Sequence, residues 1–331
     1  MGFPPVIGMT LGDANGIGPE VAVKAANLYL EEGERVLMIG EAWLAQRALD
    51  LTGIRRPLHT VSAIAEVHEA DEGLYILDTG RLRPEELLPG QATGAVGEAT
   101  VQAFHRACEF ARSGELGGVI FGPVNSDSLK MAGLTLMPPD LRQNYQMLVT
   151  GPLRVAHLTH HISLREVLDK HIKCDRVLTL LRLADHSLRK WGMPHPRIAV
   201  AGLNPHCDGV EDSAELVPAV AQAVQEGIDA YGPVAPDSVF RQCIDGQYDL
   251  VIALYHDQGH IAVKTWGFAG NCAVMLGVPF LVATVAHGSA YEIAWRGQAD
   301  ASMMLSSLRT CTSLVRGEGF PQSQQAEIEC E

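Results

Sequence analysis

Three histidines follow three short apolar runs of the chain, and their placement could support metal chemistry. They are His161, His206 and His256, and each comes just after a run that is typical of a β-strand. Parallel strands of an open α/β sheet point their carboxyl ends to one edge, where such sheets bind ligands. Three imidazoles at that edge can hold a divalent cation and leave a coordination position for a substrate oxygen. The pattern predicts a metal centre, and structural or surface histidines without a ligand are the alternative.

Two charged residues accompany His256 in the sequence. Asp257 comes next and could orient the imidazole, contact the metal or act as a general base. Lys264 follows within the same segment, close enough to pair with the carboxylate of a substrate. Both residues are therefore candidates for catalysis or substrate binding beside His256.

A glycine-rich stretch near the N-terminus is a second candidate for ligand binding. Gly12, Gly16 and Gly18 allow backbone conformations and close approaches that other residues do not. Pro19 suits the first turn of a helix, whose free N–H groups favour an anion. The stretch matches neither the Walker loop nor the dinucleotide fingerprint, so an ordinary strand-to-helix turn is the alternative.

The elements that must position these residues alternate along the chain. Short runs rich in Val, Ile and Leu are separated by segments with helical apolar spacing, including 19–30, 94–113 and 163–182. This alternation predicts an α/β fold with a parallel or mixed sheet and helices on both faces. We expect a first domain from residues 1–128 and 300–331, and a second from 129–299.

Composition excludes several classes of protein. The chain has 331 residues, 47% of them hydrophobic, and a formal net charge of -14. Such a charge disfavours nucleic acids and anionic membranes as partners, because neutralising phosphates requires clustered Lys and Arg. We find no apolar run that could span a bilayer, no signal-peptide pattern, and seven scattered cysteines without paired spacing. These features predict a cytoplasmic enzyme with reduced thiols.

Five segments in a fixed order carry a family resemblance. They are Gly12-Asp-Ala-Asn-Gly-Ile-Gly-Pro-Glu20, Gly122-Pro-Val-Asn125, Gly202-Leu-Asn-Pro-His206, Tyr255-His-Asp-Gln-Gly259 and His287-Gly-Ser-Ala290. With them the chain resembles the 4-hydroxythreonine-4-phosphate dehydrogenase family of vitamin B6 synthesis. The first and last segments are also similar to those of isocitrate and isopropylmalate dehydrogenases. The resemblance implies a two-domain α/β/α sandwich of that type, with the active site in the interdomain cleft.

The resemblance also implies roles for individual residues. It implies a homodimer whose divalent metal is bound by His161, His206 and His256, with His161 donated by the partner subunit. Lys264 matches a substrate-binding lysine, and Asp237 and Asp257 match acidic residues near the reacting centre. Gly12 and the segment His287, Gly288, Ser289 and Ala290 match the part that receives NAD or NADP. Imidazole ligands suit zinc, cobalt or nickel better than magnesium.

The implied reaction is oxidation of a β-hydroxy acid by the nicotinamide cofactor, followed by decarboxylation. The metal would polarise the hydroxyl oxygen and stabilise the enolate that forms as carbon dioxide leaves.

Substrate recognition departs from the family pattern. Ala273 and Val282 occupy positions where the family has a substrate-binding Asn and Arg, and Arg suits phosphate. We therefore expect a non-phosphorylated substrate of the terephthalate cis-dihydrodiol type. Oxidation of 4-phosphohydroxy-L-threonine in pyridoxal phosphate synthesis is one alternative, and a catalytically silent metal- or ligand-binding homologue is another.

Overall fold

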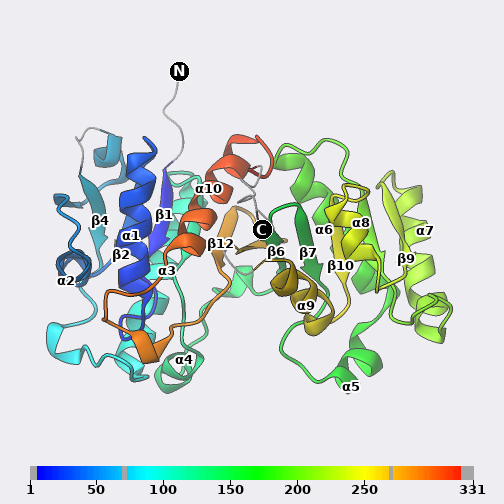
Figure 1. The fold of residues 1–331 in the computed structure, drawn as a ribbon, viewed down its shortest axis with the longest axis horizontal. Helices are drawn as coiled ribbons and strands as arrows, with labels where there is room; N and C mark the ends of the chain where they lie inside the picture. Colours follow the sequence, from blue (N-terminus) through cyan, green and yellow to red (C-terminus); the bar gives the residue numbers. More distant parts are fainter. Residues whose placement is uncertain (1–5, 69–72, 268–270, 322–331) are drawn as a thin grey trace, which may run out of the picture. The chain divides into compact units, whose positions relative to one another are not determined.

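The computed structural model describes residues 6–68, 73–267 and 271–321, which form two compact units (Figure 1). Unit 1 comprises the chain up to Arg142 together with Val278–Arg316, and unit 2 comprises Gln143–Gly277 and the chain from Gly317 onward. The predicted α/β class is confirmed. No helix among the described residues is long and apolar enough to cross a membrane.

The described residues of unit 1 form six parallel strands. Their order is β3 (Leu58–Val61), β4 (Leu74–Asp78), β2 (Val36–Gly40), β1 (Ile7–Thr10), β5 (Gly118–Phe121) and β12 (Leu281–Val285). All residues of β1, β2, β5 and β12 are buried, because helices cover both faces of a parallel sheet. These apolar strands form the core of the unit.

The helices of unit 1 pack in two groups. The long helix α1 (Gly18–Glu31) contacts α2 (Ala42–Thr52) and α10 (Ser302–Arg316), whereas α3 (Gly94–Ser113) contacts α4 (Ser126–Ala132) (Figure 1). Pro19 lies in the first turn of α1, as predicted, and α3 spans the predicted segment 94–113. Short 3-10 turns occur at Ile64–His68, Pro84–Glu86, Pro139–Leu141 and Tyr291–Ile293.

In unit 2, the part of the chain that the structure describes forms a mixed set of six strands. Their order is β11 (Cys272–Leu276), β6 (Tyr145–Thr150), β7 (Leu153–His157), β10 (Leu250–Ala253), β8 (Ile198–Ala201) and β9 (Ala230–Val234). The β11–β6 and β6–β7 pairs are antiparallel, and the remaining pairs are parallel. The helices are α5 (Leu164–Glu166), α6 (Cys174–Lys190), α7 (Val217–Gln225), α8 (Val239–Ile244) and α9 (His256–Trp266).

The predicted helix over 163–182 is interrupted in the structure. Ser163 Oγ accepts the N–H of Glu166 and starts α5 as expected, but a π-helical turn over Val167–His171 follows. A second helix, α6, then begins at Cys174, whose N–H donates to the carboxylate of Glu215 at 2.8 Å. Apolar spacing alone does not reveal this break, because the capping carboxylate comes from a distant segment.

The first change between units follows residue 142, whereas the sequence placed it at 128. Two contacts tie the intervening segment to α3 of unit 1. Arg112 forms an ion pair with Asp140 at 2.7 Å, and His105 Nε2 hydrogen bonds with the carbonyl of Leu136 at 3.0 Å. The chain then returns from unit 2 to unit 1 at Val278, earlier than the expected residue 300.

Candidate active site

The three predicted histidines follow the carboxyl ends of three neighbouring parallel strands. His161 comes after β7, His256 begins α9 after β10, and His206 comes after β8. β10 pairs with both β7 and β8 in parallel register, so the three segments leave the sheet at one edge of unit 2. This is the edge at which open α/β sheets place their ligands.

Side-chain hydrogen bonds tie these strand ends together. Thr159 Oγ1 donates to the carbonyl of Leu254 at 2.9 Å, which links the ends of β7 and β10. Gln258 Nε2 donates to the carbonyl of Gly202 at 2.9 Å, which links α9 to the end of β8. Gln258 also accepts the N–H of Leu254 through Oε1 at 2.7 Å. The segments that carry the histidines are therefore held in place by their own polar groups.

His161 and His256 lie side by side within one chain. Their ring centroids are 5.1 Å apart, and the ring planes are inclined by 46°. Two imidazoles bound to one zinc ion, with Zn–N distances of about 2.0–2.1 Å, place their ring centres roughly 5 Å apart. The observed pair therefore fits two ligands of one ion.

Asp257 is placed to orient the His256 ring. Its Oδ1 lies 2.6 Å from His256 Nδ1, so the imidazole that donates through Nδ1 keeps Nε2 unprotonated as a lone-pair donor. The side chain of Asp257 is 72% exposed, which leaves this single hydrogen bond open to competition from water.

His206 lies exposed in the loop after β8, which a buried carboxylate organises. Asp212, 0% exposed, accepts the N–H groups of Leu203 and Asn204 at 2.7 and 3.1 Å. It also accepts Asn204 Nδ2 at 2.6 Å. The loop is therefore fixed at its base, while the His206 ring has no ring contact with His161 or His256 that the structure records.

The three predicted ligands do not form one cluster among the described residues. Within residues 6–68, 73–267 and 271–321, no group of three or more His, Cys, Asp or Glu side chains is arranged to hold a metal ion. One chain brings the rings of His161 and His256 together. The donor set fits a divalent metal of the imidazole-preferring kind.

The other predicted substrate residues lie in different environments. Lys264 is exposed on α9, and Asp237 is exposed in the turn that precedes α8. Ala273 lies in strand β11 and Val282 lies in strand β12, and both side chains are 0% exposed. Because these two side chains are fully packed in their own units, neither offers a surface to a small molecule in this chain.

The glycine-rich stretch of unit 1 is shaped around a buried carboxylate. Asp13, 1% exposed, accepts the N–H groups of Asn15 and Gly16 through Oδ1 at 2.9 and 3.1 Å. Its Oδ2 accepts the hydroxyl of Tyr291 at 2.9 Å and that of Ser128 at 3.3 Å. Burial raises the pKa of Asp13, although all four hydrogen bonds oppose the increase. Gly12, at φ +74°, lies so close to Pro123 that a Cβ would sit 2.6 Å from its carbonyl oxygen.

The segment from His287 to Ala290 lies beside this stretch. The N–H of Ile17 donates to the carbonyl of Ser289 at 2.9 Å, so the two predicted cofactor segments are in contact within unit 1. Ser289 Oγ and His287 Nε2 are buried and make no hydrogen bond among the described residues. Buried polar atoms without partners are costly. Two such atoms therefore fit a segment that binds the polar groups of a nucleotide cofactor.

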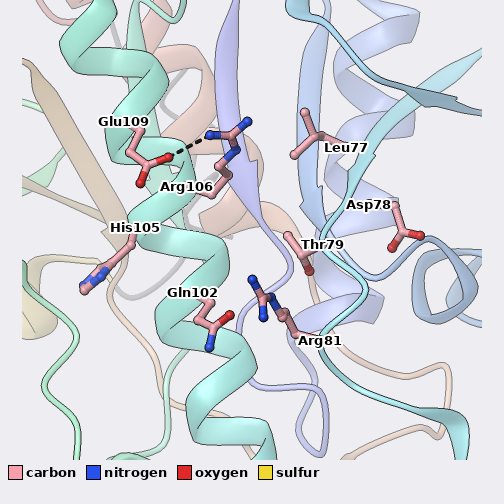
Figure 2. Close-up of a pocket in the computed structure, with 8 residues that line it drawn as sticks. All are labelled: Leu77, Asp78, Thr79, Arg81, Gln102, His105, Arg106 and Glu109. Carbon is pink, nitrogen blue, oxygen red and sulfur yellow. Dashed lines mark hydrogen bonds and ion pairs between the residues drawn. The ribbon is translucent and has the colours of Figure 1, made fainter.

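Unit 1 also carries a polar pocket that the sequence did not reveal (Figure 2). Its volume is about 390 Å³, and it lies between the end of β4 and one face of α3. The guanidinium groups of Arg81 and Arg106 point into this space, and Arg106 pairs with Glu109 at 2.8 Å. Asp78 and Glu109 balance the two arginines, so the lining has no excess charge of either sign. The pocket therefore does not define a ligand class.

Sequence reasoning also missed a group of histidines behind the predicted ligands. His157, His160 and His260 join His161 and His256 in a chain of ring contacts. Burial, with smaller repulsion from neighbouring imidazoles, lowers the pKa of both His160 and His260 to about 4. It lowers the pKa of His157 well below its ordinary value. These rings are neutral at pH 7. The spacing of His256 and His260, one helical turn apart, was a signal that could have found them.

Comparisons with known proteins identify the family. A family model described as pyridoxal phosphate biosynthetic protein PdxA matches residues 32–311. A relative from Novosphingobium aromaticivorans, provisionally named a 4-hydroxythreonine-4-phosphate dehydrogenase, is 46% identical over 96% of this chain and 97% of its own length. The D-threonate 4-phosphate dehydrogenase of Salmonella typhimurium is 35% identical over 93% of this chain and 98% of its own.

Solved structures agree with this assignment. The 4-hydroxythreonine-4-phosphate dehydrogenase of Klebsiella pneumoniae has a TM-score of 0.83 at 34% identity, covering 94% of this chain and 99% of its own. A terephthalate 1,2-cis-dihydrodiol dehydrogenase from Burkholderia xenovorans is more distant, with a TM-score of 0.67 at 28% identity over 93% and 98%. The expected preference for a non-phosphorylated dihydrodiol is therefore not supported. The chain is a dehydrogenase, an oxidoreductase acting on a CH–OH group, and it belongs to the PdxA family.

Proposed function

We propose that this protein oxidises the phosphate ester of a small hydroxy acid, with NAD or NADP as hydride acceptor. The observation that carries the proposal is full-length similarity to relatives whose names specify 4-hydroxythreonine 4-phosphate or D-threonate 4-phosphate. Both are four-carbon hydroxy acids with a phosphate on the terminal carbon. Family membership implies a nicotinamide cofactor and a divalent metal in general terms.

The absence of an arginine at position 282 is weak evidence against a phosphate. Val282 is fully buried, so a larger charged side chain could not replace it without rearranging the surroundings. Phosphate is also bound by lysine and by backbone N–H groups, and neither requires that position. The exposed Lys264 is the cation of unit 2 that we propose for substrate binding.

We propose that His161, His206 and His256 bind the metal, with zinc preferred over cobalt, nickel and magnesium. When bound, the metal would act as a Lewis acid that polarises the reacting oxygen. Asp257 holds the His256 ring, Asp237 and Asp257 are the candidate acid–base groups, and Lys264 neutralises the substrate. Gly12 and residues 287–290 are proposed to hold the cofactor.

We further propose a homodimer in which one subunit completes the metal site of the other. The incomplete ligand set of one chain supports this. Exposed large apolar side chains that neighbour His161 and His260 in the sequence also support it, because apolar surface of this kind can be covered by a protein partner. Ile162 is 41% exposed, Leu164 52% and Ile261 65%.

The substrate is tested by following NADH absorbance with metal-loaded protein. We expect turnover with 4-phosphohydroxy-L-threonine or D-threonate 4-phosphate, and at least a tenfold lower kcat/KM with unphosphorylated D-threonate, because a site built for an anion loses its main contact. Faster turnover of terephthalate cis-dihydrodiol than of either phosphate would contradict the proposal. Binding of these acids without any change in absorbance would instead indicate a catalytically silent homologue.

A further inference from the structure

His260 covers one face of the His256 ring. The two residues lie one turn apart on α9, with ring centroids 3.6 Å apart and planes inclined by only 14°. Stacked rings restrict rotation of each other about the side-chain bonds, since a rotated ring would collide with its neighbour. The orientation of His256 therefore depends on where His260 is held.

Hydrogen bonds hold His260 and fix its tautomer. Its Nδ1 lies 3.1 Å from the carbonyl oxygen of His256, which can only accept, so Nδ1 carries the proton. The same Nδ1 lies 3.1 Å from Nε2 of His157. His157 donates in turn through Nδ1 to the carbonyl of Gln146 at 3.4 Å, which leaves its Nε2 as an acceptor. All three contacts are compatible with one set of neutral tautomers.

His157 is a rigid anchor for this arrangement. It is the last residue of β7, is 0% exposed and pairs with Ala253 of β10. Helix α9 lies directly against it at Gly259, where a Cβ would sit 2.3 Å from His157 Nε2 and 2.7 Å from Val155 Cγ1. A glycine is needed for the helix to approach the strand closely enough for His260 to reach His157.

We infer that His157 and His260 are positioning residues that fix the ring plane of His256 for metal binding. The inference rests on the proposed function, in which His256 is a metal ligand. Asp257 fixes one ring nitrogen of His256 from solvent, and the stacked His260 fixes the ring from the protein side. With both in place, His256 Nε2 has a single direction in which to meet an ion. Partners behind metal ligands commonly change metal affinity roughly ten- to a hundredfold.

The test measures Co²⁺ binding by the full-length protein, through its dissociation constant and its visible absorption spectrum. His260→Ala removes both the stacking and the hydrogen bond, whereas His260→Phe keeps an aromatic face and loses the hydrogen bond. His186→Ala, an exposed histidine on α6, is the matched control. Thermal unfolding followed by circular dichroism establishes that each variant is folded.

We expect His260→Ala to weaken Co²⁺ binding roughly ten- to a hundredfold and to shift the spectrum. We expect His260→Phe to restore part of the affinity, and His186→Ala to match the wild type. Unchanged affinity and spectrum in a folded His260→Ala variant would overturn the inference, and equal losses in Ala and Phe variants would overturn its stacking argument. Failure of the wild type to bind Co²⁺, or of His256→Ala to weaken binding, would instead refute the proposed metal centre, and the inference would fall with it.

Discussion

Asp13 illustrates how one buried carboxylate organises a loop. Four donors converge on it from the glycine-rich stretch, from the start of α4 and from the turn at Tyr291. Its burial is only partly compensated, because desolvation outweighs the hydrogen bonds and raises its pKa. The folded state therefore binds a proton more tightly than the unfolded chain. The contribution of Asp13 to the free energy of unfolding is therefore largest below its ordinary pKa of 3.8. This contribution falls as the pH rises from 3.8 through the raised pKa.

We predict that Tyr291→Phe lowers the free energy of unfolding by about 1–3 kcal/mol at pH 7, because the buried carboxylate loses a donor. The loss should shrink in acid, since the missing hydrogen bond raises the pKa of Asp13 further and protonation then relieves the burial. Urea unfolding from pH 4 to pH 7 measures both effects. Tyr231→Phe, which removes the hydroxyl of a 39% exposed tyrosine, is the control. Equal stability loss at both ends of the pH range would argue against this account.

At the scale of elements, helix α9 packs tightly against β7 near the site. Helix α9 begins at His256 and crosses the buried end of β7, and Gly259 lies at the crossing. Glycine inside a helix costs about 1 kcal/mol of stability relative to alanine. A glycine at position 259 is therefore explained by the lack of space for a Cβ. Here the strand and its histidine occupy that space.

We predict that Gly259→Ala destabilises the protein by about 1–3 kcal/mol despite its better helix propensity, because the new methyl group overpacks the contact. In the background of His157→Ala the same change should cost less, since the atom nearest to the methyl group is gone. A double-mutant cycle of unfolding free energies measures this coupling. Additive effects of the two changes would show that the crossing tolerates the extra carbon.

At the scale of the whole molecule, we propose that two copies of the chain complete each metal site. One chain brings His161 and His256 together, whereas His206 lies on a separate loop. In a symmetric dimer, a ligand donated by one subunit is also donated by the other, so both sites depend on both chains.

We predict that mixing the inactive variants His161→Ala and His206→Ala restores activity to about a quarter of the wild type, because half of the random dimers carry one intact site. The assay is NADH formation after denaturation and joint refolding of the two variants. A mixture of His161→Ala with His256→Ala regains activity only if His161 is the donated ligand, as the family resemblance implies. No recovery in any pairwise mixture would show that the three ligands come from one chain.

Much of the architecture was encoded in local sequence patterns. The alternation of apolar runs and helical segments predicted the α/β class, and the ends of α1 and α3 follow from Pro19 and from the apolar spacing over 94–113. The placement of three histidines after strands predicted their common edge, because parallel strands share a direction. Local patterns of this kind depend on residues that are neighbours in the chain.

Contacts between distant segments decided the rest. The break before α6 depends on Glu215, the loop that holds His206 depends on Asp212, and the packing of His260 depends on His157 at the end of another strand. The apolar residue at position 282 had suggested a substrate without a phosphate, but the burial of Val282 shows that its side chain is part of the protein core. Sequence patterns determined which elements form and which residues reach the edge of the sheet. Tertiary structure alone decided which side chains touch there, because burial and hydrogen bonding between remote residues leave no periodic signal in the chain.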